Sequence, residues 1–183
     1  LETLLPTLKA LILEWAGIAH SVEKKPKRKR KMVNFKIVLG VVLVFAISSC
    51  GKDQMEVDTN KIEEYLEDNN LTAEKTEDGL YYIINEEGTG ARPDITSEVT
   101  VHYKGYVLNG DIFDSSYDSG KKITFPLANV IQGWQLGIPL FREGGSGTLL
   151  IPSHLGYGEY PPNGSVIRKN EVLLFDIELF DVN

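Results

Sequence analysis

The chain has 183 residues, enough for one ordinary globular domain with extensions. Hydrophobic residues make up 42% of it and charged residues 25%, which is typical of a globular protein. Residues 1–50 carry 9 Lys and Arg against 3 Asp and Glu, whereas residues 51–183 carry 10 against 23, a net charge of −13. So acidic a body repels phosphate backbones, and we therefore exclude nucleic acid as its partner.

The basic residues of the first part gather at 24–31, directly before Met32. Alone, such a run is typical of a nuclear or nucleic-acid-binding patch. The apolar stretch 37–47 that follows is shorter than the roughly 20 residues of a membrane span, and a positive flank before a short apolar core is typical of an export signal. We therefore expect residues 1–31 to be a basic leader or an over-extended N-terminus, and residues 32–50 to be the signal segment.

The export signal ends at Cys50, the only cysteine of the chain. Residues 47–50, Ile-Ser-Ser-Cys, resemble the bacterial lipobox, in which the cysteine is lipidated and becomes the first residue of the mature protein. This resemblance implies a lipoprotein of the bacterial cell envelope, held at the membrane through Cys50 and facing the periplasm or the exterior. The alternative is an uncleaved apolar helix with a free thiol. A lone cysteine also excludes an intramolecular disulfide.

Residues 51–75 are expected to form a tether and a short helix. Residues 52–58 are polar and predict the tether. Asp58 or Thr59 can cap a helix that runs to about Asn69. The apolar residues of this helix fall on one face: Ile62, Tyr65 and Leu66. Its expected role is to pack against the following domain or to space it from the membrane.

Residues 76–183 change to the period-two pattern of strands. Strands are predicted at 80–84, 98–108, 111–113, 147–152 and 171–180, with a tight turn at Asn109-Gly110. A short helix is predicted near Trp134, limited by Gly137 and Pro139. Several strands with one short helix define an α+β domain with an antiparallel sheet.

Motifs for bound cofactors are missing from the sequence. It contains neither a glycine-rich phosphate or dinucleotide loop nor a His, Cys, Asp and Glu set at metal-ligand spacing, so we predict no cofactor and no metal. His102 and His154 have no nucleophile motif beside them, and we interpret both as hydrogen-bonded structural residues.

Five short motifs follow one another in the last hundred residues: Val-His-Tyr-Lys-Gly at 101–105, Phe-Asp-Ser-Ser at 113–116, Val-Ile-Gln-Gly-Trp at 130–134, Gly-Tyr-Gly at 156–158 and Leu-Phe-Asp-Ile-Glu-Leu at 174–179. In this order and spacing the region 76–183 resembles the FKBP-type peptidyl-prolyl cis/trans isomerases. The resemblance implies a twisted antiparallel β-sheet wrapped around a short α-helix, with an apolar pocket between them. It also implies an enzyme that assists the folding of exported proteins.

The resemblance further assigns roles to single residues. Trp134 would form the pocket floor, and Tyr103, Phe113 and Phe175 its sides. Asp114 would lie beside the carbonyl group that precedes the substrate proline, while the Ile131 N–H and the Tyr157 hydroxyl would hold the bound peptide. The remaining substrate-binding positions are apolar: Val130 at the rim, Val166 and Ile167 in the long loop before the last strand, and Ile123 where the family usually has an aromatic residue. Proline-containing polypeptides are the implied substrates, and macrolides are the implied inhibitors.

Several alternatives stay open from the sequence. Asp114 can instead cap its loop by accepting hydrogen bonds from Ser115 and Ser116, and we expect Phe125 to belong to the core rather than to the pocket wall. At the level of the whole protein, the alternatives are a folding helper that binds proline segments with little or no turnover, and a purely structural envelope lipoprotein.

Overall fold

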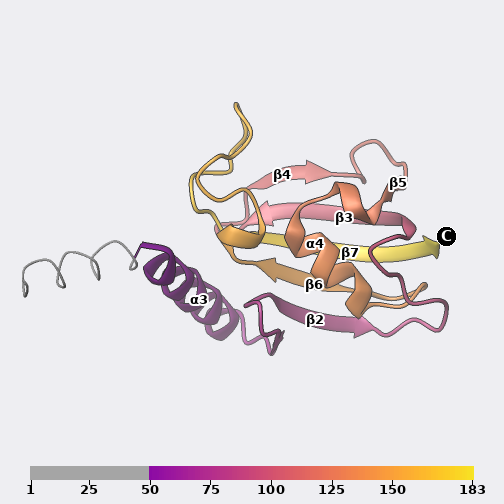
Figure 1. Ribbon diagram of the computed structural model, residues 1–183, viewed down its shortest axis with the longest axis horizontal. Helices are drawn as coiled ribbons and strands as arrows, with labels where there is room; N and C mark the ends of the chain where they lie inside the picture. Colours follow the sequence, from indigo (N-terminus) through magenta and orange to yellow (C-terminus); the bar gives the residue numbers. More distant parts are fainter. Residues whose placement is uncertain (1–49) are drawn as a thin grey trace, which may run out of the picture. The chain divides into compact units, whose positions relative to one another are not determined.

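The computed structural model describes residues 50–183 (Figure 1). Side chains are described from Gln54 onward. The expected basic leader and nearly all of the signal segment, up to residue 49, lie outside the described residues. Within the described part, no helix is both long enough and apolar enough to span a membrane.

The described residues form one antiparallel sheet of seven strands. Its order is β1-β2-β6-β7-β3-β4, and β5 also pairs with β3. The strands are β1 (Glu74–Lys75), β2 (Tyr81–Glu86), β3 (Glu98–Val107), β4 (Ile112–Ser115), β5 (Ile123–Pro126), β6 (Ser146–Ile151) and β7 (Leu173–Val182). The two longest strands, β3 and β7, lie side by side at the centre of the sheet. The predicted antiparallel sheet is thus confirmed.

Short helical segments complete the domain. They are η1 (Leu127–Asn129), α4 (Gln132–Gly137), η2 (Ile138–Leu140) and η3 (Ser153–Leu155). Helix α4, which contains Trp134, lies across one face of the sheet (Figure 1). The short helix predicted near Trp134 is therefore confirmed, and the chain continues past it into η2, which contains Pro139.

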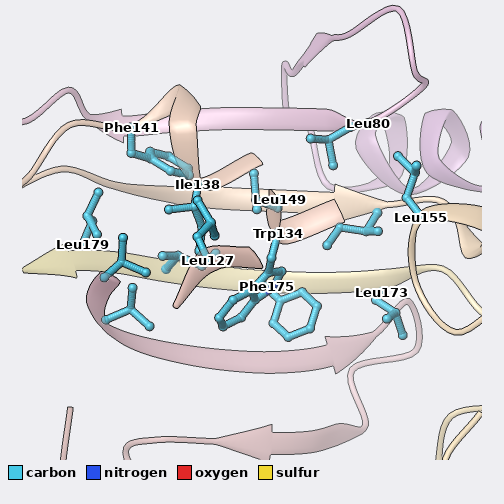
Figure 2. Close-up of a cluster of buried hydrophobic side chains, with 14 of the residues drawn as sticks. Leu80, Leu127, Trp134, Ile138, Phe141, Leu149, Leu155, Leu173, Phe175 and Leu179 are labelled. Carbon is cyan, nitrogen blue, oxygen red and sulfur yellow. The ribbon is translucent and has the colours of Figure 1, made fainter. Parts of the chain in front are cut away.

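The sheet buries apolar side chains on both of its faces. On β7, Leu173, Phe175 and Ile177 join a large cluster with Trp134, whereas Leu174 faces a second cluster. This alternation follows from the period-two geometry of a strand. Figure 2 shows the large cluster, with side chains from α4, η1 and η2 packed onto those of the sheet. The second cluster is formed with the preceding helix and is built on Ile62, Leu66, Tyr81, Leu150, Val172 and Leu174.

Close packing of α4 on the sheet depends on a glycine. A Cβ atom on Gly133 would overlap the side chain of Ile151 in β6. Because a side chain at this position would push the helix away from the strand, Gly133 sets the depth at which the neighbouring Trp134 lies.

Helix α3 (Cys50–Asp68) corrects the sequence-based interpretation of its own N-terminal part. Residues 52–58 belong to the helix and do not form a tether. Asp58 is not an N-cap residue; it lies in the middle of the helix and is fully buried. The predicted apolar face is confirmed, because Ile62 and Leu66 are buried in the second cluster. The helix ends as expected before Asn69 and Asn70, the latter with a φ of 53°.

Candidate active site

A cavity of about 600 Å³ opens on the face of the sheet that carries α4. Its wall combines aromatic and aliphatic side chains with a few polar groups: Tyr103, Phe113, Asp114, Ile123, Phe125, Asn129, Val130, Ile131, Trp134, Tyr157, Pro162, Ser165, Ile167 and Phe175. Ten of these residues were predicted from the sequence as site residues. The structure therefore brings together residues from four strands, the two helical segments η1 and α4, and two loops that are far apart in the chain.

Trp134 lines the aromatic part of this cavity. Its side chain is only 5% exposed. Its ring centroid is 5.0 Å from those of Tyr103 and Phe175, with edge-to-face ring planes at 86° and 79°. Edge-to-face contacts satisfy the ring quadrupoles and hold the indole in one orientation. Figure 2 shows Trp134 and Phe175 packed against one another. Among the described residues, the indole N–H has no hydrogen-bond partner.

Strands β3 and β4 supply the side of the pocket. Phe113 on β4 meets Phe175 on β7 with ring centroids 5.4 Å apart. This contact crosses Gly105 of β3, where a Cβ atom would lie 2.6 Å from Phe113 and 2.9 Å from Phe175. The glycine of the first sequence motif is thus explained by the two rings that close over it.

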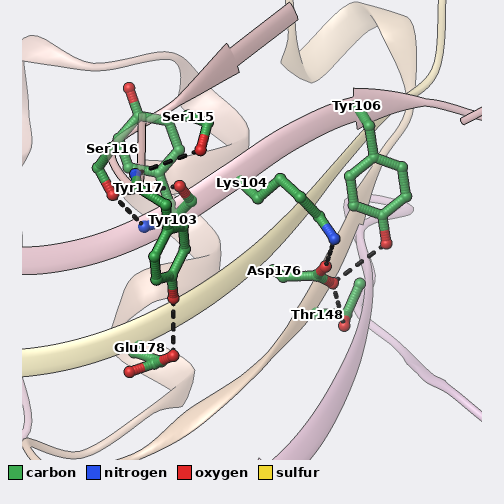
Figure 3. Close-up of polar contacts among 9 residues, drawn as sticks. All are labelled: Tyr103, Lys104, Tyr106, Ser115, Ser116, Tyr117, Thr148, Asp176 and Glu178. Carbon is green, nitrogen blue, oxygen red and sulfur yellow. Dashed lines mark hydrogen bonds and ion pairs between the residues drawn. The ribbon is translucent and has the colours of Figure 1, made fainter. Parts of the chain in front are cut away.

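Asp114 is exposed at the edge of the cavity, and its Oδ2 atom accepts a hydrogen bond of 2.5 Å from the Tyr103 hydroxyl. Within the described residues it receives no hydrogen bond from Ser115 or Ser116. Instead, Ser116 Oγ accepts from the Tyr103 N–H at 2.8 Å (Figure 3). The interpretation of Asp114 as a loop cap is therefore wrong, because its carboxylate accepts from the Tyr103 hydroxyl and not from Ser115 or Ser116.

Two phenol groups border the cavity, and both stay protonated at neutral pH. Burial, together with the hydrogen bond and the negative charge of Asp114, raises the pKa of Tyr103 far above its usual value. Burial also raises the pKa of Tyr157, and the charge of Asp114 raises it further. The Tyr157 hydroxyl can therefore donate a hydrogen bond to a bound peptide, whereas the Tyr103 hydroxyl already donates its proton to Asp114.

The segment before α4 forms the rim. Val130 and Ile131 both line the cavity. The Gln135 side chain holds them in place, because its Nε2 donates to the carbonyl oxygens of Ala128 at 3.2 Å and Val130 at 2.9 Å. Among the backbone hydrogen bonds of the described residues, the Ile131 N–H donates none. This N–H is thus free to donate to a carbonyl oxygen of a bound peptide.

The long loop before β7 was expected to contribute both Val166 and Ile167 to the site, and it contributes only one of them. Ile167 lines the cavity and is 6% exposed, whereas Val166 is 48% exposed and does not line it. Ile123 lines the cavity as expected. Phe125, expected in the core only, lies 5.4 Å from Trp134 and also faces the cavity, so that expectation was wrong.

Sequence reasoning also missed Asn129, Pro162 and Ser165. Asn129 directly precedes the third motif, which begins at Val130, and Pro162 lies in a double proline. Position beside these features was the available signal.

His102 and His154 do not line the pocket. His102 Nδ1 is 2.7 Å from Ser116 Oγ, and its ring stacks on Tyr117 at 4.5 Å. Tyr117 in turn donates to Glu178 (Figure 3). His154 Nε2 lies 3.2 Å from the Asp78 carbonyl oxygen. These contacts agree with the structural interpretation of both residues. No cluster of three or more potential metal ligands occurs among the described residues.

An antiparallel sheet around a short helix, with an aromatic pocket between them, defines the class of fold. A family model described as FKBP-type peptidyl-prolyl cis-trans isomerase matches residues 90–180. The crystal structure of AtFKBP13 is 34% identical, with a TM-score of 0.55, over 61% of this chain and 99% of that one. The chain belongs to the FKBP-type peptidyl-prolyl cis-trans isomerase family, and the predicted family and fold are confirmed.

Bacterial members of the family are also similar. The FKBP-type peptidyl-prolyl cis-trans isomerase FkpA of Buchnera aphidicola subsp. Schizaphis graminum is 49% identical over 109 residues, which is 59% of this chain and 42% of the relative. The crystal structure of FkpA from Escherichia coli is 29% identical, with a TM-score of 0.62, over 97% of this chain and 81% of that one. The chain spans less than half of the length of the first curated relatives that it matches.

Proposed function

We propose that this protein catalyses the cis–trans isomerisation of peptide bonds that precede proline. The observation that carries the proposal is the cavity of about 600 Å³, which Trp134, Asp114 and Tyr157 line together. A cavity of this size accommodates a proline ring and its neighbouring residues, and its apolar wall excludes water.

The reaction explains why neither a nucleophile nor a metal is needed. Rotation about a peptide bond faces a barrier of ~18–20 kcal/mol, because resonance gives the C–N bond partial double-bond character. The twisted amide has lost this resonance and has less charge separation than the planar one. A dry aromatic pocket favours the twisted form by withdrawing the water that stabilises the planar ground state.

In this proposal each group has a defined task. Trp134, Phe175 and Phe113 surround the proline ring. The Ile131 N–H and the Tyr157 hydroxyl donate hydrogen bonds to the flanking peptide carbonyls and so fix the chain on either side of the rotating bond. Asp114, held by Tyr103, lies beside the carbonyl group that precedes the proline and acts on it electrostatically. The apolar residues Val130, Ile123 and Ile167 contact the substrate at the rim, and macrolides that fill the cavity would compete with it.

A protease-coupled assay on a chromogenic proline tetrapeptide tests this function. We expect the protein to accelerate the slow phase in proportion to its concentration. If the peptide binds but isomerises at the uncatalysed rate, the protein is a folding helper without turnover. If the peptide neither binds nor isomerises faster, the protein is purely structural.

We also propose that the protein acts on exported polypeptides at the bacterial cell envelope, anchored by a lipid on Cys50. The sequence order of basic flank, short apolar core, small residues and cysteine supports this. The Cys50→Ala variant should move from the membrane fraction to the soluble fraction, while the matched Ser49→Ala variant stays in the membrane. A Cys50→Ala variant that remains in the membrane fraction contradicts the lipid anchor.

A further inference from the structure

Helix α3 contacts the loop that carries Tyr157 through a buried aspartate. Asp58 has no exposed surface, and Ser153, the first residue of η3, is 1% exposed. Asp58 Oδ2 accepts hydrogen bonds from the Ser153 N–H at 2.9 Å and from Ser153 Oγ at 2.5 Å. Its Oδ1 accepts from Gln54 Nε2 at 2.7 Å. Both carboxylate oxygens are thus satisfied without solvent, which offsets the cost of burying a charged group.

Ser153 connects Asp58 to the backbone beside the pocket residue Tyr157. Its carbonyl oxygen accepts hydrogen bonds from the Gly156 N–H at 3.0 Å and from the Gly158 N–H at 2.9 Å. These two glycines flank Tyr157, whose side chain lines the cavity. The backbone on both sides of Tyr157 is therefore bonded to the one residue that Asp58 holds. Because Asp58 Oδ2 accepts from both the N–H and the hydroxyl of Ser153, it restrains this residue at two points.

We propose that Asp58 is a positioning residue for the isomerase site, which acts through Ser153 to hold Tyr157 at the cavity edge. The inference rests on the proposed function, since it assigns a residue to that same site. A shift of about 1 Å in a group that orients the substrate can reduce a rate by ~10²-fold. Helix α3 thereby becomes part of the catalytic apparatus, although Asp58 itself does not line the cavity.

The helix also provides a matched control. Glu63 of α3 accepts a hydrogen bond of 2.7 Å from the Tyr81 hydroxyl of β2. This second contact attaches the helix to the sheet but does not involve Ser153 or the Tyr157 loop. If α3 serves only as an anchor, loss of either contact should have the same kind of effect. If Asp58 positions Tyr157, only loss of the Asp58 contact should change catalysis.

The test compares Asp58→Ala, Glu63→Ala and Asp58→Asn in the full chain by kcat/KM on a proline tetrapeptide. We expect Asp58→Ala to lower kcat/KM at least about fivefold and Glu63→Ala to leave it unchanged. Asp58→Asn should retain most of the activity. The asparagine carbonyl oxygen can still accept from Ser153, and a flipped Gln54 side-chain amide can accept from the asparagine NH₂ group. Should Asp58→Ala fail to fold, Ser153→Ala, which removes only the hydroxyl contact, should give a smaller loss of the same kind.

Two further readouts distinguish positioning from stability. In a Tyr157→Phe background, Asp58→Ala should have little additional effect on kcat/KM, because both changes act through the same hydroxyl. Amide hydrogen exchange, followed by mass spectrometry on peptides covering residues 153–160, should be faster in Asp58→Ala than in Glu63→Ala. Unchanged exchange in these peptides, or an equal loss of activity with and without the Tyr157 hydroxyl, would overturn the inference. Faster exchange in a protein without isomerase activity would refute the proposed function alone.

Discussion

The Trp134→Leu variant separates the pocket floor from the general core. The indole contacts the rings of Tyr103, Phe175 and Phe125 at centroid distances of 5.0, 5.0 and 5.4 Å. Each aromatic pair contributes about 0.5–1.5 kcal/mol beyond its area burial, so the loss of all of them lowers the free energy of unfolding by about 3 kcal/mol. Leucine keeps much of the apolar burial, and the indole N–H has no partner among the described residues to lose.

A domain with a stability of about 5–15 kcal/mol remains folded after such a loss. Urea denaturation followed by far-ultraviolet circular dichroism measures the change in unfolding free energy, and the coupled peptide assay measures kcat/KM. We expect kcat/KM to fall several-fold. Phe141→Leu is the control, because Phe141 is 1% exposed in the same cluster but does not line the cavity. It should lose stability and keep the wild-type rate. A wild-type rate in Trp134→Leu would refute the assignment of the floor.

Three further predictions test the packing and the charges. Gly133→Ala should lower the free energy of unfolding by about 1–3 kcal/mol in urea denaturation, because the added methyl overlaps a β6 side chain; unchanged stability contradicts this. Asp114→Asn should lower turnover several-fold and bring the Tyr103 pKa back toward its ordinary value in an ultraviolet titration, and an unmoved Tyr103 pKa argues against their coupling. Burial and the hydrogen bond to Glu178 raise the pKa of Tyr117 to about 12. The stability that its protonated form contributes is therefore complete below about pH 10 and is lost as the pH rises through 12; Glu178→Gln should bring this loss to lower pH.

The sheet could be predicted from the sequence because its strands carry a local signal. In β7, Leu173, Phe175 and Ile177 alternate with Leu174, and the two sets are buried on opposite faces. The pocket could be predicted because its aromatic residues lie in short motifs whose order is typical of one family. Trp134 and Tyr157 needed no knowledge of long-range contacts to be singled out.

The misses all depend on contacts between distant segments. Asp58 has the local features of a helix cap. Its place inside the helix becomes clear only from its contact with Ser153, which is 95 residues away and donates two hydrogen bonds to it. Phe125 packs beside Trp134 and also faces the cavity, a distinction that depends on the path of the rim segment. Val166 and Ile167 are similar side chains in adjacent positions, and only the course of the loop sets which one reaches the pocket.

Exchange NMR on a proline-containing peptide with a substoichiometric amount of the protein tests the central claim most directly. The method observes the cis and trans forms at equilibrium, so turnover is measured without a protease and separately from binding. The account predicts exchange cross-peaks at mixing times at which the peptide alone gives none, and their loss in Trp134→Leu. Peptide signals that broaden because of binding, while the cis–trans exchange stays at the uncatalysed rate, would contradict the account.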